Sequence, residues 1–182
     1  MKIEIINGDI TTLKVDAIVN AANKELNHGG GVCGAIHDQA GPMLAKECER
    51  LSRRLGGVLP GEAFITGGYE LPARHVIHTL GPVWRAGDAQ AQAELRAELA
   101  ACYTNSLAVA EEHKLTSIAF PSIGTGAFGW EKEQAAQIAI PTIFRQKPQH
   151  VQQISLCCHN DAEEMQMMQS IVDAEQRGDG TS

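Results

Sequence analysis

The sequence predicts one α/β domain, in which short strands alternate with longer helices. Short apolar runs rich in Ile and Val recur along the chain, and segments with apolar residues at helical spacing stand between several of them. The 182 residues are enough to bury one substantial core. Because 43% of the residues are hydrophobic and 20% are charged, the composition argues against general disorder.

Six segments have the pattern of β-strands. Lys2–Asn7 alternates apolar and polar residues, which is typical of an edge strand. Residues 17–20, AIVN, form a short apolar run that predicts a buried strand. The remaining strands are expected at 63–66, 75–80, 117–120 and 154–158.

The clearest helix should run from about residue 89 to residue 113, with Asp88 as its N-terminal cap. Its apolar positions, which include Leu95, Leu99 and Leu107, fall on one face at helical spacing. Residues 131–144 and 161–174 are also helical by pattern, although Pro141 is expected to break or kink the first of them. The domain is expected to span residues 1–175, and residues 176–182 should form a frayed tail.

Charge and composition exclude several classes of partner. The formal net charge of -7 argues against general binding to a nucleic-acid backbone, whereas uncharged backbone N–H groups can still bind a small anion. No segment approaches the roughly 20 apolar residues of a membrane span, and we expect a cytoplasmic protein without a membrane partner. The five cysteines form no CxxC pair, which favours reduced thiols and no metal site.

A first glycine loop, residues 29–31, follows a predicted strand and precedes a helix expected to start near Val32. Consecutive glycines let the backbone approach a ligand closely, and a helix N-terminus supplies unpaired N–H groups and partial positive charge. Asn20 and Asn23 stand at the end of the strand. The pattern favours a phosphate or pyrophosphate site; a glycine turn without a ligand is the alternative.

A second glycine loop also lies between a predicted strand and a helix, and its residues are Ser122, Ile123, Gly124, Thr125, Gly126, Ala127 and Phe128. Phe128 either packs onto the core or stacks on a ligand ring. Neither loop matches the GxxxxGK[ST] or the GxGxxG dinucleotide pattern. Two such loops suggest that a diphosphate is held between them.

Asp9 follows the first strand directly. Its carboxylate could accept a hydrogen bond from an exocyclic amine such as that of adenine, or it could cap the turn after it, which is the commoner use of such a residue.

Taken together, these segments resemble the macrodomain family from about residue 2 to residue 168. The matching segments are GDIT from Gly8, VDAIVNAAN from Val15, HGGGV from His28, GEAFIT from Gly61, LPARHVIHTLGPVW from Leu71 and PSIGTGAFG from Pro121. The resemblance implies a three-layer α/β/α fold around a central mixed sheet, with the ligand cleft at the carboxyl ends of the central strands.

The resemblance also implies a role for each part of the cleft. Asp9 would hold the adenine amine, Ile10 would line the adenine pocket, and Asn23 would contact the distal ribose. Asn20 would support that loop. The diphosphate and distal ribose would lie between two sets of residues: Gly30, Gly31 and Val32 on one side, and Ser122 to Phe128 on the other.

Many members of this family hydrolyse ADP-ribose esters, either O-acetyl-ADP-ribose or mono-ADP-ribose on Asp and Glu side chains of proteins. The resemblance therefore implies a hydrolase that needs no cofactor, with ADP-ribose, O-acetyl-ADP-ribose or ADP-ribosylated proteins as partners. Orientation and electrostatics can supply much of the rate of such a reaction. The alternative is a non-catalytic reader of ADP-ribose or of ADP-ribosylated proteins.

The chain departs from the family pattern at two places. One branch of the family has a catalytic aspartate after GGGV, where this chain has Cys33. The candidate catalytic residues are then Asn23, His28 and Cys33, of which Cys33 is either a nucleophile or a small residue at an alanine-like position. Family members often place an aromatic residue on adenine after the last strand, and here Cys158 or His159 would have to replace it.

Overall fold

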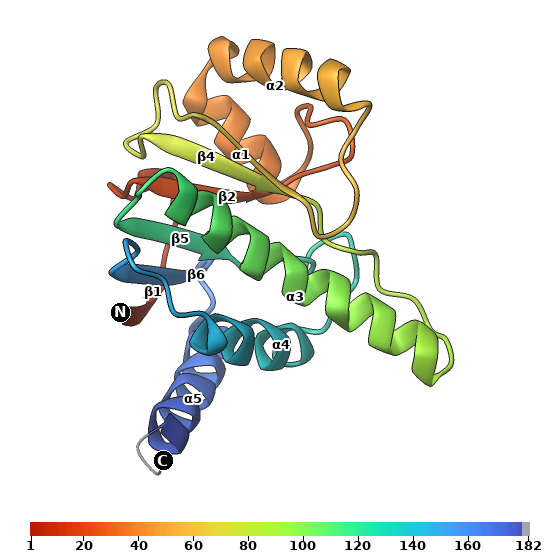
Figure 1. The fold of residues 1–182 in the computed structure, drawn as a ribbon, viewed down its shortest axis with the longest axis vertical. Helices are drawn as coiled ribbons and strands as arrows, with labels where there is room; N and C mark the ends of the chain where they lie inside the picture. Colours follow the sequence, from red (N-terminus) through yellow and green to blue (C-terminus); the bar gives the residue numbers. More distant parts are fainter. Residues whose placement is uncertain (180–182) are drawn as a thin grey trace.

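A mixed six-stranded sheet forms the middle layer of the fold, and helices cover both of its faces (Figure 1). The computed structural model describes residues 1–179. The sheet order is β1-β6-β5-β2-β4-β3, and the strands are β1 (Lys2–Asn7), β2 (Ala17–Ala21), β3 (Ala63–Gly67), β4 (His75–Thr79), β5 (Ser117–Pro121) and β6 (Gln153–Cys158). Neighbouring strands are parallel except for β3 and β4, which are antiparallel. The expected three-layer α/β/α arrangement is confirmed.

The strand predictions agree with the structure to within one residue at each end. β1 forms an edge of the sheet, as its alternating pattern indicates, and β2 lies between β4 and β5. Side chains along β2 alternate between the two faces, so Val19 enters one hydrophobic core and Ile18 enters the other. Both faces of β2 are therefore buried.

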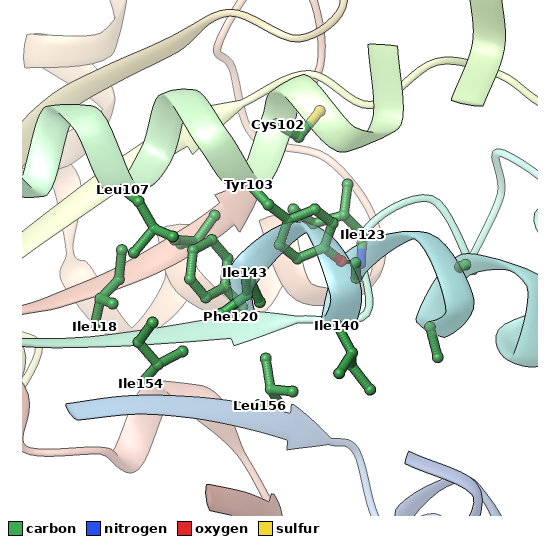
Figure 2. Close-up of a cluster of buried hydrophobic side chains, with 14 of the residues drawn as sticks. Cys102, Tyr103, Leu107, Ile118, Phe120, Ile123, Ile140, Ile143, Ile154 and Leu156 are labelled. Carbon is green, nitrogen blue, oxygen red and sulfur yellow. Dashed lines mark hydrogen bonds between the residues drawn. The ribbon is translucent and has the colours of Figure 1, made fainter. Parts of the chain in front are cut away.

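Five α-helices occur in residues 1–179, and they divide between the two faces of the sheet. The smaller core lies beneath α1 (Gly31–Ala40) and α2 (Pro42–Leu55). The larger core lies between the sheet and α3 (Ala89–Glu112), α4 (Lys132–Arg145) and α5 (Ala162–Asp179). Figure 2 shows part of the larger core, where the rings of Tyr103 and Phe120 lie 5.1 Å apart between α3 and β5.

The helix predictions were less complete than the strand predictions. α3 agrees closely, and Asp88 caps it by accepting a bond from the Ala91 N–H (2.9 Å). α2 was not predicted, although its sequence carries the signals. Pro42 stands in its first turn, Gly56 ends it in the left-handed conformation, and a buried stripe of Leu44, Cys48 and Leu51 recurs at helical spacing.

Pro141 does not end α4, which continues to Arg145. A proline inside a helix costs about 3 kcal/mol. Ile140 and Ile143 stand on both sides of it and are fully buried in the larger core, and burying each such side chain contributes roughly 1.5–3 kcal/mol. The burial of these two side chains offsets the cost of the proline.

α5 also extends further than the sequence indicated. Residues 176–179, expected to belong to a frayed tail, continue this helix, and residues 180–182 lie outside the described residues. Met168 and Val172 anchor α5 in the larger core, and the polar residues after them carry no periodic pattern from which the extension could be predicted. In the described part of the chain, no helix combines the length and the apolarity that crossing a membrane requires.

Candidate functional site

The loops that follow the parallel strands surround a cleft of about 700 Å³. The carboxyl ends of the parallel strands β1, β6, β5, β2 and β4 share one edge of the sheet, where ligands of α/β proteins usually bind. The wall of the cleft includes residues 8–10, 21–23, 29–33 and 121–128, together with Ala35, Gly81, Lys132, Cys157, His159 and Glu164. The volume lies within the range of roughly 300–1,000 Å³ that small-molecule sites occupy.

The first glycine loop leads directly into α1 and presents bare backbone to the cleft. A Cβ atom on Gly30 or Gly31 would meet no heavy atom within 4 Å, so both residues face open space. The N–H groups in the first turn of α1 have no partner within the helix, and the helix dipole adds partial positive charge there. This side of the cleft can therefore hold an anion with main-chain donors.

The second glycine loop also lines the cleft and is fixed to the larger core. Ile123 is fully buried there (Figure 2), and its N–H donates to the Tyr103 hydroxyl (3.3 Å), so this amide is already occupied. Gly124 has a φ of +84°, and its carbonyl accepts a bond from the Trp130 N–H (3.0 Å). Gly126 faces open space, as Gly30 does. The exposed part of the loop is therefore held on a rigid support.

Phe128 packs onto a core, as one of the two alternatives considered for it requires, and the stacking on a ligand ring stays a prediction. It is partly buried against the smaller core, and it also lines the cleft. Thr125, Ala127 and Val32 also line the cleft.

Asp9 caps a short 3-10 helix, η1 (Ile10–Thr12), and lines the cleft as well. Its Oδ1 accepts bonds from the N–H of Thr11 (2.9 Å) and from the Thr11 hydroxyl (2.7 Å). Both bonds end on Oδ1, and an ionised carboxyl can accept further bonds on its second oxygen. The capping role is thus present without excluding a ligand. Ile10 is buried in the wall next to it.

Asn20 lies beneath the cleft instead of lining it, which agrees with the supporting role expected for it and not with a direct contact to the ligand. The side chain is fully buried, and its Nδ2 lies 3.1 Å from His78 Nδ1 and 3.7 Å from Cys33 Sγ. Side chains alternate along β2, so Ala21 reaches the cleft while Asn20 supports the start of α1 from below. Burial, reinforced by the nearby His37, lowers the pKa of His78 to about 3, so this ring is neutral.

Asn23 lines the cleft, but its amide is engaged in holding the loop that contains it. The Nδ2 donates to the carbonyl of Asn27 (2.9 Å), and the Oδ1 accepts from the N–H of the same residue (3.1 Å). The second Nδ2 hydrogen is the donor that the side chain can still offer to a ligand.

His28 does not line the cleft, which corrects its place among the catalytic candidates. Its Nε2 lies 2.9 Å from Asp38 Oδ1, and its side chain is 56% exposed. The contact with Asp38 of α1 holds the ring outside the cleft wall.

Cys33 lies in the wall of the cleft and is almost completely buried. Burial raises the pKa of its thiol, and hydrogen bonds, the first from Asn20, offset this only in part. The helix N-terminus therefore does not produce a thiolate at neutral pH. This argues against Cys33 as a nucleophile and favours the small-residue interpretation.

The end of β6 contributes alternate residues to the cleft. Cys157 and His159 line it, whereas Cys158 is fully buried on the other face and its Sγ lies 3.4 Å from Met168 Sδ. Of the two residues considered as substitutes for the missing aromatic, His159 is the one in the cleft wall.

The sequence analysis missed a charged cluster beside the second glycine loop, of which Ser122, Lys132 and Glu164 line the cleft and Asp161 does not. This Glu164 cluster consists of Ser122, Lys132, Asp161 and Glu164. The Ser122 hydroxyl donates to Glu164 Oε1, and Lys132 Nζ lies 3.2 Å from Glu164 Oε2 and 2.5 Å from Asp161 Oδ2. The hydrogen bond to Asp161 is the main cause that raises the pKa of Lys132. The signal in the sequence was weak, because these residues come from three separate segments.

Residues 1–179 contain no group of three His, Cys, Asp or Glu side chains placed to hold a metal ion. Among the described residues, Asp9 and Glu164 are the carboxylates in the cleft wall.

Comparison with known proteins identifies the family. The model of the Macro domain family matches residues 19–139. The chain belongs to the macrodomain family. Among curated relatives, this macrodomain is 52% identical over 140 residues to an O-acetyl-ADP-ribose deacetylase of Klebsiella pneumoniae, covering 77% of this chain and 78% of that protein. It is 46% identical over 166 residues to the ADP-ribose glycohydrolase MACROD1 of Rattus norvegicus, covering 90% of this chain and 62% of that protein.

A macro domain-containing protein of Chlorobaculum tepidum, whose name states only the family, is 53% identical over 161 residues, covering 87% of this chain and 89% of that protein. Among solved structures, a macrodomain variant of Oceanobacillus iheyensis with ADPR superposes with a TM-score of 0.87 at 37% identity, covering 96% of this macrodomain and 94% of that chain. The fold and the order of the cleft loops described above are thus those of a macrodomain.

Proposed function

We propose that this macrodomain binds ADP-ribose in its cleft and hydrolyses ADP-ribose esters, namely mono-ADP-ribosyl Asp or Glu on proteins, O-acetyl-ADP-ribose, or both. The observation that carries the proposal is the pair of glycine loops, which both line one cleft and expose glycine backbone there. The names of the two enzymes among the relatives, and the nucleotide in the superposed structure, support it.

The cleft accommodates the parts of ADP-ribose in order. The diphosphate lies between Gly30–Gly31 and the second glycine loop, where main-chain N–H groups donate hydrogen bonds to it. Adenine lies at the end formed by Asp9, Ile10 and His159, and the distal ribose lies at the end formed by Asn23, Cys33 and Phe128.

Hydrolysis of an ester at the distal ribose requires a water molecule at the carbonyl carbon. The water forms the new C–O bond, the bond to the ribose oxygen breaks, and the products are the free carboxylic acid and ribose hydroxyl. Asn23 offers one hydrogen-bond donor at this end, and Cys33 stays protonated. A phosphate oxygen of the ligand is the remaining base, and orientation of the water can lower the barrier by up to roughly 7–11 kcal/mol.

Two substrates test the proposal directly. We expect the protein to release ADP-ribose from a glutamate-linked, mono-ADP-ribosylated protein, or to release acetate from O-acetyl-ADP-ribose, while an arginine-linked conjugate serves as the non-ester control. Calorimetric titration with ADP-ribose, AMP and ribose-5-phosphate measures binding separately. Binding of ADP-ribose with both esters left intact would refute the hydrolase and leave a binding protein.

A non-catalytic reader is the second candidate, and the buried, protonated Cys33 favours it. Under this alternative, Cys33→Asp should create or strongly raise ester hydrolysis, because a carboxylate can accept a proton from the attacking water. Rapid hydrolysis by the unaltered protein argues against the reader.

A further inference from the structure

The Glu164 cluster lies where the adenosine ribose has to pass, if the ligand binds as proposed above. Adenine contacts the loop after β1, and the diphosphate contacts the second glycine loop, so the sugar that joins them must cross the wall between these loops. Glu164 stands in that wall. It accepts a bond from Ser122, the first residue of the second loop, and both it and Asp9 lie close enough to the Cys157 thiol to act on it electrostatically.

The carboxylate of Glu164 is oriented by the protein before any ligand arrives. Its side chain is 5% exposed, its Oε1 is held by Ser122 and its Oε2 by Lys132. A carboxylate has about four lone-pair positions on its two oxygens, so positions remain for further donors. The two hydroxyls of a ribose are donors of the matching kind.

The charge at this end of the cleft is unfavourable for an additional phosphate. Asp9, Asp161 and Glu164 carry three negative charges against the one positive charge of Lys132. Lys132 lies between the carboxylates of Asp161 (2.5 Å) and Glu164 (3.2 Å), so its charge is already compensated. A phosphate on the adenosine ribose would lie in the part of the cleft that Asp9 and Glu164 line, where repulsion between negative charges is costly.

We propose that Glu164 binds the hydroxyls of the adenosine ribose and makes the cleft selective for ADP-ribose over ADP-ribose that is phosphorylated on this sugar. The diphosphate is recognised by main-chain amides that cannot distinguish these two ligands. The Glu164 cluster therefore has to distinguish the two ligands. It selects ADP-ribose that derives from NAD over the form that derives from NADP and carries a 2′-phosphate.

Calorimetric titration of the whole protein with ADP-ribose and with its 2′-phosphate tests this inference. We expect at least tenfold tighter binding of ADP-ribose. Glu164→Gln keeps the shape of the side chain but removes its charge, so it should weaken ADP-ribose binding severalfold and reduce the ratio between the ligands. Glu163→Gln is the matched control, since Glu163 is the exposed neighbour on the same helix, and should leave both affinities unchanged.

A second variant keeps the test decisive if Glu164→Gln folds poorly. Lys132 is 48% exposed, and Lys132→Gln makes the same end of the cleft more negative, so the preference for ADP-ribose should increase severalfold. Equal binding of the two ligands by the unaltered protein, or a preference that neither variant changes, would overturn the inference while leaving the proposed function intact. Failure of the unaltered protein to bind ADP-ribose would overturn both.

Discussion

Replacing Gly124 with alanine tests how rigidly the second glycine loop is held. Gly124 has a φ of +84°, and an added Cβ would lie 2.8 Å from Trp130 Cδ1. The Trp130 ring cannot move aside easily, because its Nε1 donates to the Pro82 carbonyl (2.9 Å). The left-handed conformation costs an alanine about 1–2 kcal/mol, and overpacking costs about 1–3 kcal/mol more.

We therefore expect Gly124→Ala to lower the free energy of unfolding by about 2–5 kcal/mol, measured by urea denaturation. Any shift that relieves the contact moves the amides of the loop, so ADP-ribose affinity measured by calorimetry should fall at least about tenfold, or 1.4 kcal/mol. Gly126→Ala is the matched control, because its Cβ meets no heavy atom within 4 Å. Its stability should change by less than about 0.5 kcal/mol. The reasoning fails if Gly124→Ala unfolds at the same urea concentration as the unaltered protein, or if both variants are equally destabilised.

Three further predictions concern single groups. Asp9→Ala should lower the free energy of unfolding by about 1 kcal/mol, because the cap of the short 3-10 helix is lost. The variant should bind ADP-ribose about tenfold or more weakly and ribose-5-phosphate as before. An equal loss of affinity for both ligands would contradict the contact between Asp9 and adenine. Burial raises the pKa values of the Cys48, Cys157 and Cys158 thiols to about 12, 11 and 12. At a pH above about 9, these thiols therefore stay protonated in the folded protein, whereas the same thiols ionise in the unfolded chain. Stability should therefore fall as the pH rises above about 9, by roughly 1.4 kcal/mol per thiol and pH unit, and constant urea midpoints at pH 8 and pH 10 would refute this. Burial raises the pKa of Glu111, but hydrogen bonds from backbone N–H groups, first that of Val151, outweigh it and lower the pKa to about 2. Glu111→Gln should therefore lower the free energy of unfolding by about 1–3 kcal/mol at pH 7. The difference from the unaltered protein should shrink as the pH falls from 4.5 towards 2.

The sequence was sufficient to predict those elements whose structure depends on residues close to one another along the chain. The strands and α3 were predictable because alternation, helical spacing and the Asp88 cap are local signals. Both glycine loops were predictable for the same reason. α2 was missed although its proline, its glycine and its apolar stripe are equally local, so the omission was one of interpretation.

Contacts between distant segments could not be predicted in this way. Ser122 and Glu164 are 42 residues apart, and nothing in either segment marks the other as its partner. The orientation of Asn20 depends on which face of β2 reaches the cleft. The orientation of His28 depends on its contact with Asp38, which lies ten residues later, in α1. Such assignments require the register of the sheet and the placement of α1 against it.

The hydroxyl of Tyr103 connects the interior of the protein to the loop that is expected to hold the ligand. Its ring is packed among α3, β5 and α4, while its oxygen accepts the Ile123 N–H at the base of the second glycine loop (Figure 2). A substitution such as Tyr103→Phe preserves the packing and removes this tether alone. A change at this interior position is accordingly expected to lower the affinity for the ligand without any change at the surface.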